Sequence, residues 1–221
     1  MNNPQYMSGT GNNFLVSEYE NSKTDIEIIS IVADSLFDID GVIYVEKIDS
    51  LTVKMHYYNN DGSTAELCVN GIRCVAKYAL DNSIVDSNDV TVVAPIGNIK
   101  TNIKENTVSI EVSTPTYEKN KLLIDGLECI KSNIGNPHLL VEVDNVDKFD
   151  LEQFVKKVYD TKEFENGVNV EIFNMFDKKI INARVYERGV GETDACGSGA
   201  VCMFYYLYNT NQVNNNSLIF Y

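Results

Sequence analysis

Two segments of the chain repeat a cysteine pattern that is suited to acid–base chemistry. Residues 66–74 read ELCVNGIRC and residues 194–202 read DACGSGAVC, so each has an acid two residues before a cysteine, a glycine three after it and a second cysteine six after it. The first cysteine of each segment, Cys68 or Cys196, precedes a turn that opens an apolar helix. Because the first N–H groups of a helix lack internal partners and attract anions, we expect a thiolate there to be stabilised and its pKa to fall from about 8.5.

Two such thiols can invert a carbon centre if they face it from opposite sides. A thiolate removes the α-proton of an amino acid and the opposite thiol delivers a proton, so no cofactor is needed. The α-C–H bond is a very weak acid, and two helix N-termini directed at the carboxylate would stabilise the developing charge. Cys74, Cys129 and Cys202 are interpreted as small buried hydrophobic residues, and from spacing alone that interpretation is equally open for Cys68 and Cys196.

The repeat also predicts how the chain is organised. Its copies lie 128 positions apart (68 to 196), which indicates two similar halves, residues 1–114 and 115–221, dividing where Pro115 and a polar stretch interrupt the strands. Apolar periodicity predicts helices at residues 25–34, 71–80, 151–158 and 200–207. Short β-branched or aromatic runs predict strands at residues 14–18, 41–45, 51–58, 89–93, 107–112, 139–143, 169–173 and 180–186.

The composition narrows the class of protein. Hydrophobic residues make up 44% of the 221 residues, enough for a packed core, and the net charge of −14 argues against a nucleic-acid partner. No apolar run is long enough to span a bilayer and the first residues do not resemble a signal peptide, so we expect no membrane partner and a cytoplasmic location. Five cysteines without a CxxC motif, and only two histidines, make a structural metal site improbable.

Four motifs, in their order along the chain, resemble the diaminopimelate epimerase family. They are MSGTGNNFLV at residues 7–16, YYNNDGSTAELCVNGIRCVAKY at 57–78, IGNPH at 134–138 and GVNVEIFNMFDKKIINARVYERGVGETDACGSGAVC at 167–202. The resemblance implies an α+β fold of two similar halves, each a mostly antiparallel curved sheet around a central helix, at about residues 71–80 and 197–208. Members of the family continue for several more strands, so the C-terminal end of this chain is expected to be short.

The resemblance also implies roles for individual residues. Cys68 and Cys196 would be the two acid/base thiols, and His138 and Glu187 would ionise or position them. Arg188 would hold the distal carboxylate and amine of an amino-acid substrate, together with Asn59, Asn136 and Asn169. The remaining expected substrate contacts are Asn12 and the backbone of Val69, Asn70, Gly197 and Ser198. No cofactor and no metal are implied.

Several of these residues have simpler interpretations. Asn136 and Asn169 could be turn residues, His138 a satisfied core histidine, and Asn70 a helix N-cap. Glu187 and Arg188 could form a surface ion pair.

One departure from the family's pattern bears on activity. Val69 stands where the family has glycine, and we expect it to lower activity relative to glycine. It would do so either by strain at a positive φ or, as we favour, by narrowing the pocket from ordinary helical angles.

The expected reaction is interconversion of LL- and meso-diaminopimelate, in lysine and peptidoglycan biosynthesis. Two alternatives remain: a racemase of another amino acid on the same scaffold, and a relative that binds a ligand without turnover. A homodimer is also left open.

Overall fold

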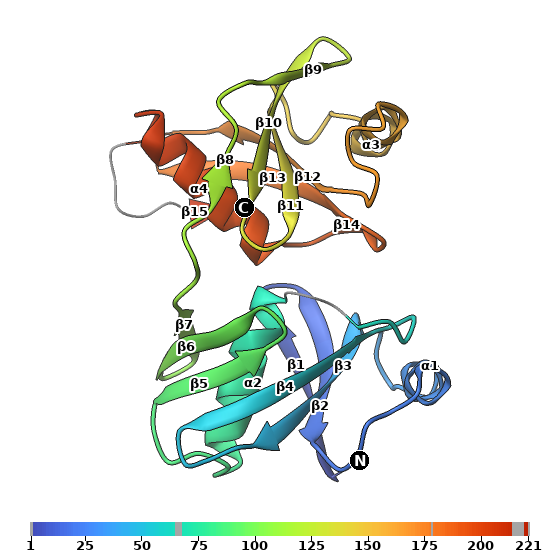
Figure 1. Ribbon diagram of the computed structural model, residues 1–221, viewed down its shortest axis with the longest axis vertical. Coiled ribbons are helices and arrows are strands. Elements are labelled where there is room, and N and C mark those ends of the chain that lie inside the picture. Colours follow the sequence, from blue (N-terminus) through green and yellow to red (C-terminus); the bar gives the residue numbers. More distant parts are fainter. Residues whose placement is uncertain (1, 65–67, 178, 214–218, 221) are drawn as a thin grey trace. The chain divides into compact units, whose positions relative to one another are not determined.

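The computed structural model describes residues 2–64, 68–177, 179–213 and 219–220, and it has an α+β fold (Figure 1). The chain divides into two compact units, Met1–Val112 and Ser113–Tyr221, here called unit 1 and unit 2. No helix of the described residues is long and apolar enough to cross a membrane.

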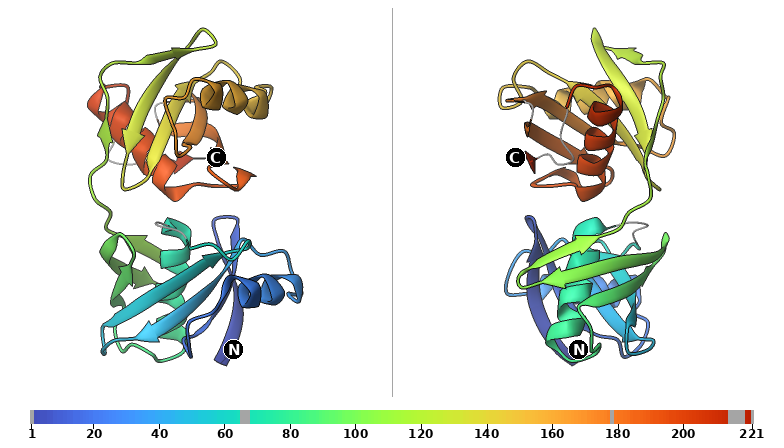
Figure 2. Two further views of the ribbon diagram at one scale, coloured as in Figure 1. Left: turned by 45° about the vertical axis from the view of Figure 1, so that its right-hand side comes forward. Right: turned by 90° about the vertical axis from the view of Figure 1, so that its left-hand side faces the viewer.

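In the part of unit 1 that the structure describes, seven strands form a curled sheet with one helix on each face. The sheet order follows the chain from β1 to β7, and only the pairs β2–β3 and β4–β5 are parallel. The helix α2 lies within the curl of the sheet (Figure 2). The elements are β1 (Asn2–Gly9), β2 (Asn12–Glu18), α1 (Asp25–Ala33), β3 (Gly41–Lys47), β4 (Thr52–Asn59), α2 (Val69–Asp81), β5 (Asp89–Ala94), β6 (Gly97–Lys104) and β7 (Thr107–Ile110).

The two faces of the unit 1 sheet are covered because its central strands are apolar on both sides. Ile72, Val75 and Ala79 of α2 are buried in one core with Ile43 of β3, as the periodicity of residues 71–80 predicts. Ile28 of α1 is buried in a second core on the opposite face. The strands β2 and β3 are parallel, and α1 in the connection between them packs against this face of the sheet.

Unit 2 repeats this arrangement. Its sheet has eight strands among the described residues, in the order β14-β13-β12-β11-β10-β8, with β15 beside β13 and β9 beside β10. Only the pairs β11–β12 and β13–β15 are parallel. The elements are β8 (Thr116–Tyr117), β9 (Leu122–Ile124), β10 (Leu127–Asn133), β11 (Pro137–Glu142), α3 (Leu151–Asp160), β12 (Asn169–Met175), β13 (Ile180–Glu187), β14 (Gly191–Thr193), α4 (Gly197–Asn209) and β15 (Ile219–Phe220).

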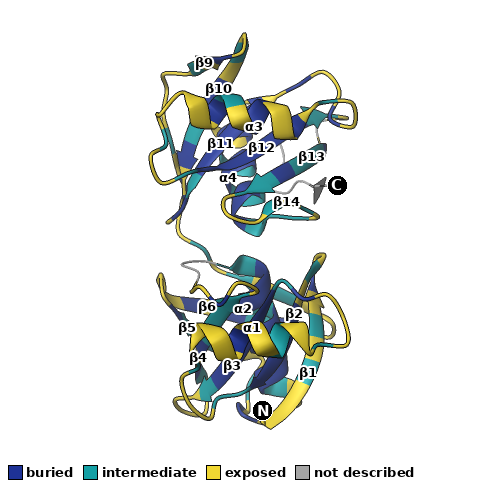
Figure 3. Cartoon of the chain, turned by 90° about the vertical axis from the view of Figure 1, so that its right-hand side faces the viewer, coloured by how far each residue is buried: buried dark blue, intermediate teal, exposed yellow. Residues whose placement is uncertain are grey.

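The helix α3 of unit 2 is amphipathic and occupies the place that α1 has in unit 1. Phe154, Val155 and Val158 are buried against Val170 and Ile172 of β12, while the other side of the helix is exposed (Figure 3). The side chain of Asp150 caps this helix by accepting a hydrogen bond from the N–H of Gln153. The strand β12 is thus buried on both faces, one toward α3 and one toward α4.

The expected fold is confirmed: two curled sheets, mostly antiparallel, each with a helix in its curl. All of the helices and strands predicted from the sequence are present, with ends that differ by a few residues. The sequence analysis missed the strands β1, β6, β8, β9, β10 and β14.

Candidate active site

The two cysteines of the repeat occupy the same position in the two units. Each is the N-cap of a 13-residue helix and has extended backbone angles, with φ −131° and ψ 94° at Cys68 and φ −123° and ψ 108° at Cys196. The sulfur of Cys68 accepts a hydrogen bond from the N–H of Gly71 at 3.2 Å, and that of Cys196 from Gly199 at 3.4 Å. Each sulfur therefore lies at the positive end of a helix.

In unit 1, two of the expected substrate-binding residues are joined in one polar network at the start of α2. The buried Asn70 donates from Nδ2 to Oδ1 of Asn12 at 2.8 Å. Its own Oδ1 accepts from the hydroxyl of Thr10 at 3.1 Å, and Arg73 donates to that hydroxyl oxygen at 2.7 Å. The network holds the first turn of α2 against the β1–β2 turn.

The other expected residues of unit 1 are placed differently. Val69 is the first residue of α2 and does not have a positive φ, so strain at this position is excluded. Cys68 is the helix N-cap, so the N-cap interpretation of Asn70 is wrong. Asn59 lies at the end of β4, where it donates a hydrogen bond to the hydroxyl of Ser63 at 2.9 Å.

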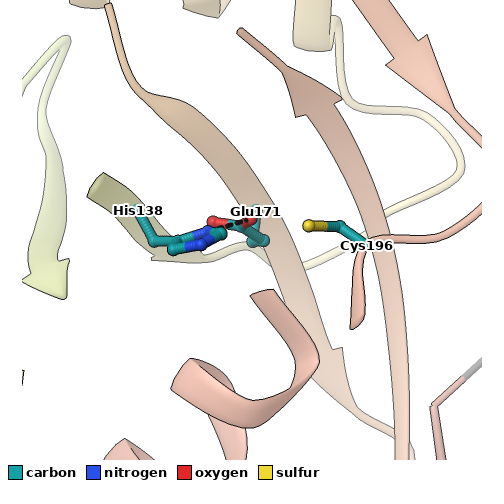
Figure 4. A group of neighbouring side chains, drawn as sticks. All are labelled: His138, Glu171 and Cys196. Atoms are coloured by element: carbon teal, nitrogen blue, oxygen red, sulfur yellow. Dashed lines mark hydrogen bonds and ion pairs between the residues drawn. The ribbon is translucent and has the colours of Figure 1, made fainter. Parts of the chain in front are cut away.

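In unit 2, a buried cluster lies beside Cys196 (Figure 4). His138 and Glu171 are fully buried, and Nδ1 of His138 lies 2.6 Å from Oε1 of Glu171. The other ring nitrogen, Nε2, lies 3.1 Å from the side-chain amide of the buried Asn136. A ring nitrogen of His138, a carboxylate oxygen of Glu171 and the sulfur of Cys196 all lie within 4.8 Å of one another. His138 is therefore a buried residue that also belongs to the surroundings of the thiol.

Glu187 completes this cluster from the end of β13. It is half-buried and accepts a hydrogen bond from the hydroxyl of Thr193 at 2.6 Å, and its charge acts on the nearby thiol of Cys196. Burial raises the pKa of Glu187, and the negative charge of Glu171 raises it further, against the lowering effects of Thr193 and His138.

The pKa of Cys196 does not follow the direction that its helix position suggests. Burial raises the pKa of this thiol well above its ordinary value, and the charges of Glu187 and Glu171 raise it further. Hydrogen bonds from Ser198 and from the Gly199 N–H oppose this change with smaller effects. The expected fall in pKa is thus wrong for Cys196, because burial and two nearby carboxylates outweigh the start of a helix.

The remaining predicted residues of unit 2 lie around this cluster. Oδ1 of the buried Asn169 accepts a hydrogen bond from the backbone N–H of Arg188 at 2.8 Å, and Asn169 is paired with His138 in the β11–β12 ladder. The exposed guanidinium of Arg188 donates to the carbonyl of Asn166 at 3.2 Å. The hydroxyl of Ser198, which follows Gly197 in the first turn of α4, lies 3.3 Å from the sulfur of Cys196.

The donor types of the cluster are those of a zinc site, namely an imidazole, a carboxylate and a thiol. However, Nδ1 of His138 is already bonded to Glu171 at 2.6 Å. The geometry is that of a hydrogen-bonded acid cluster around a thiol.

Comparison with known proteins identifies the family. The sequence profile of the family described as diaminopimelate epimerase matches residues 5–119 and 130–220. The chain belongs to the diaminopimelate epimerase family. The diaminopimelate epimerase of Thermotoga maritima is 33% identical over 89% of this chain and 81% of its own length, and that of Methanococcus maripaludis is 32% identical over 88% and 79%. The Bacillus subtilis enzyme of the same name is 30% identical over 88% and 78%.

Solved structures agree on the fold of this diaminopimelate epimerase family member. A hydroxyproline epimerase from Agrobacterium vitis aligns with a TM-score of 0.73 at 12% identity, over 97% of this chain and 79% of that one. A phenazine biosynthesis protein of the PhzF family from Bacillus anthracis aligns with a TM-score of 0.67 at 18% identity, over 91% and 78%. The family membership makes the protein an isomerase, of the diaminopimelate epimerase type or a related epimerase or racemase.

The sequence analysis of this diaminopimelate epimerase family member missed one residue of the unit 2 cluster. Glu171 is the only charged residue in the run VNVEIF at residues 168–173, which is otherwise buried and mostly apolar. A charge inside such a run is the signal that could have found it, because fully buried carboxylates are rare unless they have partners.

Proposed function

We propose that the protein interconverts LL- and meso-diaminopimelate without a cofactor, using Cys68 and Cys196 as acid and base. The observation that carries the proposal is the matched geometry of the two thiols, each the N-cap of a 13-residue helix in a similar unit. The curated relatives that bear the name diaminopimelate epimerase support the choice of substrate. The reaction would serve lysine and peptidoglycan biosynthesis.

In the proposed step, one thiolate takes the α-proton and becomes a thiol. The electron pair of the broken C–H bond passes into the substrate carboxylate, and the opposite thiol then gives its proton to the other face of the carbon. The carbon is inverted and the two sulfurs have exchanged protonation states. Exchange of protons with solvent restores the starting state, so product formed in deuterated water carries deuterium at the inverted carbon.

The starts of the two helices supply the groups that would bind the reacting carboxylate. The N–H of Gly71 and that of Gly199 are used by the two sulfurs. The binding is therefore assigned to the N–H groups of the two preceding residues in each helix, which are Val69 and Asn70 in α2 and Gly197 and Ser198 in α4.

Glu187 and His138 are proposed to control the proton of Cys196. Glu187 is a carboxylate whose charge acts on the thiol, and burial raises its pKa, which makes Glu187 a better acceptor for the thiol proton. Arg188 is proposed to grip the distal carboxylate of the substrate, with Asn59, Asn136, Asn169 and Asn12 as further contacts. An exposed arginine whose backbone N–H is bound by the buried amide of Asn169 suits a substrate with a second carboxylate and amine.

The decisive experiment follows LL-diaminopimelate in deuterated water with the purified protein. We expect α-deuteration together with formation of the meso isomer. Deuteration of another amino acid instead, in a panel at equal concentrations, would replace the substrate and leave the two-thiol chemistry in place. No deuteration of any member of the panel would mean that the protein binds without turnover.

A further inference from the structure

Glu171 is a carboxylate in the buried interior of a sheet, where charged side chains are rare. Its side chain is 1% exposed, and Oε2 has no hydrogen-bond partner among the residues that the structure describes. Only Oε1 is engaged, at 2.6 Å from Nδ1 of His138. A buried carboxylate with one unsatisfied oxygen is costly, so its presence beside a thiol calls for a function.

The first turn of α4 leaves room for this carboxylate. A Cβ atom added at Gly199 would collide with Oε1 of Glu171 and would lie 2.8 Å from its Cδ and Cγ. The carboxylate therefore packs directly against the backbone of the turn whose N-cap is Cys196. The carboxylate of Glu171 is thus held on one side by the ring of His138 and on the other by the start of α4, and the thiol of Cys196 lies close to His138 and Glu171 (Figure 4).

We propose that Glu171 is a positioning residue that orients His138 and, through its charge beside Cys196, keeps this thiol protonated in the resting enzyme. The inference rests on the proposed function, in which Cys196 is one of the two acid/base groups. The groups that face the sulfur are Glu187 from β13, Glu171 from β12, His138 from β11 and Ser198 from its own helix. Two of the four are carboxylates.

The role follows from simple electrostatics. A thiol near two carboxylates resists ionisation, because the thiolate would add a third negative charge to a buried site. The ring of His138 is oriented by Glu171 on one side and Asn136 on the other, and its position relative to the sulfur depends on both contacts. The resting enzyme would thus hold its proton on Cys196, ready for delivery to the substrate carbon.

The experiment measures iodoacetamide alkylation of Cys196 from pH 5 to 10 in the whole protein, resolved by peptide mass spectrometry. Iodoacetamide reacts with the thiolate, so the midpoint of the profile reports ionisation. In the unaltered protein we expect this midpoint to lie above that of an ordinary cysteine, which is about 8.5. A midpoint at or below that value would overturn the proposal without any substitution.

The substitution Glu171→Gln keeps the shape of the side chain and removes its charge. We expect the Cys196 midpoint to fall by about one pH unit, so that alkylation at pH 7 becomes about tenfold faster. Glu165→Gln, at an exposed position before β12, removes the same charge and should leave the midpoint unchanged. The Cys68 peptide in the same digests serves as an internal reference and should shift less than the Cys196 peptide.

An unchanged or higher Cys196 midpoint in Glu171→Gln would overturn the proposal. If that variant does not fold, Glu171→Met removes the charge with similar volume, and the same shift is expected. Alkylation does not depend on turnover. A protein that shows the expected shifts but deuterates no amino acid would therefore contradict the proposed function alone, and an active epimerase without the shift would contradict only the role of Glu171.

Discussion

The two units share one backbone frame, a curled sheet around a helix that the cysteine caps, but they surround the two cysteines with different side chains. In unit 1, the parallel ladder of β2 and β3 begins with Phe14 opposite Gly41. In unit 2, the ladder of β11 and β12 begins with His138 opposite Asn169. The two ladders match pair for pair, and in each unit the helix that the cysteine caps comes later in the chain. At the position of an apolar ring in unit 1, unit 2 therefore carries an imidazole.

The same correspondence holds further along the strands. Two residues beyond the first pair, β3 has Ile43 and β12 has Glu171. On the next strand, one residue beyond the aligned tyrosines, unit 1 has Asn59 and unit 2 has Glu187. The helix cap sets where the sulfur lies, and the flanking strands set the charges around it.

The largest expected effect tests whether both frames are needed. Cys68→Ser and Cys196→Ser should each lower net epimerisation at least about 1000-fold, because an alcohol is a far poorer acid–base group than a thiol and each direction needs one base and one acid. Formation of meso-diaminopimelate is the measurement. Cys129→Ser is the control and should change turnover little, since Cys129 is buried in the separate core of unit 2 beneath α3. Substantial activity in either of the first two variants would contradict a two-thiol mechanism.

The next effect addresses the acids that only unit 2 carries. Glu187→Gln should lower turnover about 100-fold, because the thiol of Cys196 loses its neighbouring proton acceptor. Burial raises the pKa of Glu187, so the folded state binds this proton more tightly than the unfolded state does. Stability then falls as pH rises from the ordinary carboxyl value through the raised value, and the native glutamate costs stability at neutral pH.

Glu187→Gln should accordingly melt at a higher temperature than the parent protein at pH 7 to 8. This gain should vanish toward pH 4, where both states hold the proton. Thermal melts at the two pH values, beside turnover, are the measurement. A variant that loses stability equally at both pH values would show that Glu187 acts through packing instead.

The sequence predicted the frame better than the charges, and the reason is the range of the interactions involved. The cysteines, their glycines and the helices that follow are adjacent in the chain, so their periodicity is visible locally. Glu171 comes from a strand that is buried on both faces, where alternation does not show which side a residue takes. The pKa direction at Cys196 failed for the same reason, because the carboxylates reach it from β12 and β13.

Missed strands have a local explanation. β1 is an edge strand with mostly exposed residues, so its sequence has no apolar alternation to detect. In β6 the buried side is formed by Ile99, Thr101 and Ile103, and the polar Thr101 in the middle of this side weakens the apolar alternation. Edge position and polar partners reduce the signal even where pairing is regular.

A smaller effect is expected at Gly71 and Gly199, the glycines three residues after each cysteine. A methyl group at Gly199 meets the fixed carboxylate of Glu171, whereas one at Gly71 meets Cε of Met55 at 2.9 Å, the end of a flexible side chain. Gly199→Ala should destabilise by about 1–3 kcal/mol and lower turnover about tenfold, and Gly71→Ala should cost less stability. In a Glu171→Ala background, the cost of Gly199→Ala should shrink, because the obstacle is gone. Urea denaturation of all four members of the cycle measures this coupling, and a cost that is independent of Glu171 would contradict it.

The smallest expected effect concerns the residue that directly follows each cysteine, Val69 in unit 1 and Gly197 in unit 2. Neither has a positive φ, so both backbones accept a side chain and both offer an N–H at the first position of a helix. Val69→Gly should therefore leave kcat within about threefold of the parent, with a lower KM if the valine narrows the pocket. It should also lower stability by about 0.5–1 kcal/mol, because glycine loses more conformational freedom on folding. Steady-state kinetics and urea denaturation provide the two measurements. A rise in kcat of tenfold or more would mean that valine disturbs the N–H groups that hold the carboxylate, and that the two frames are less alike than their backbone angles indicate.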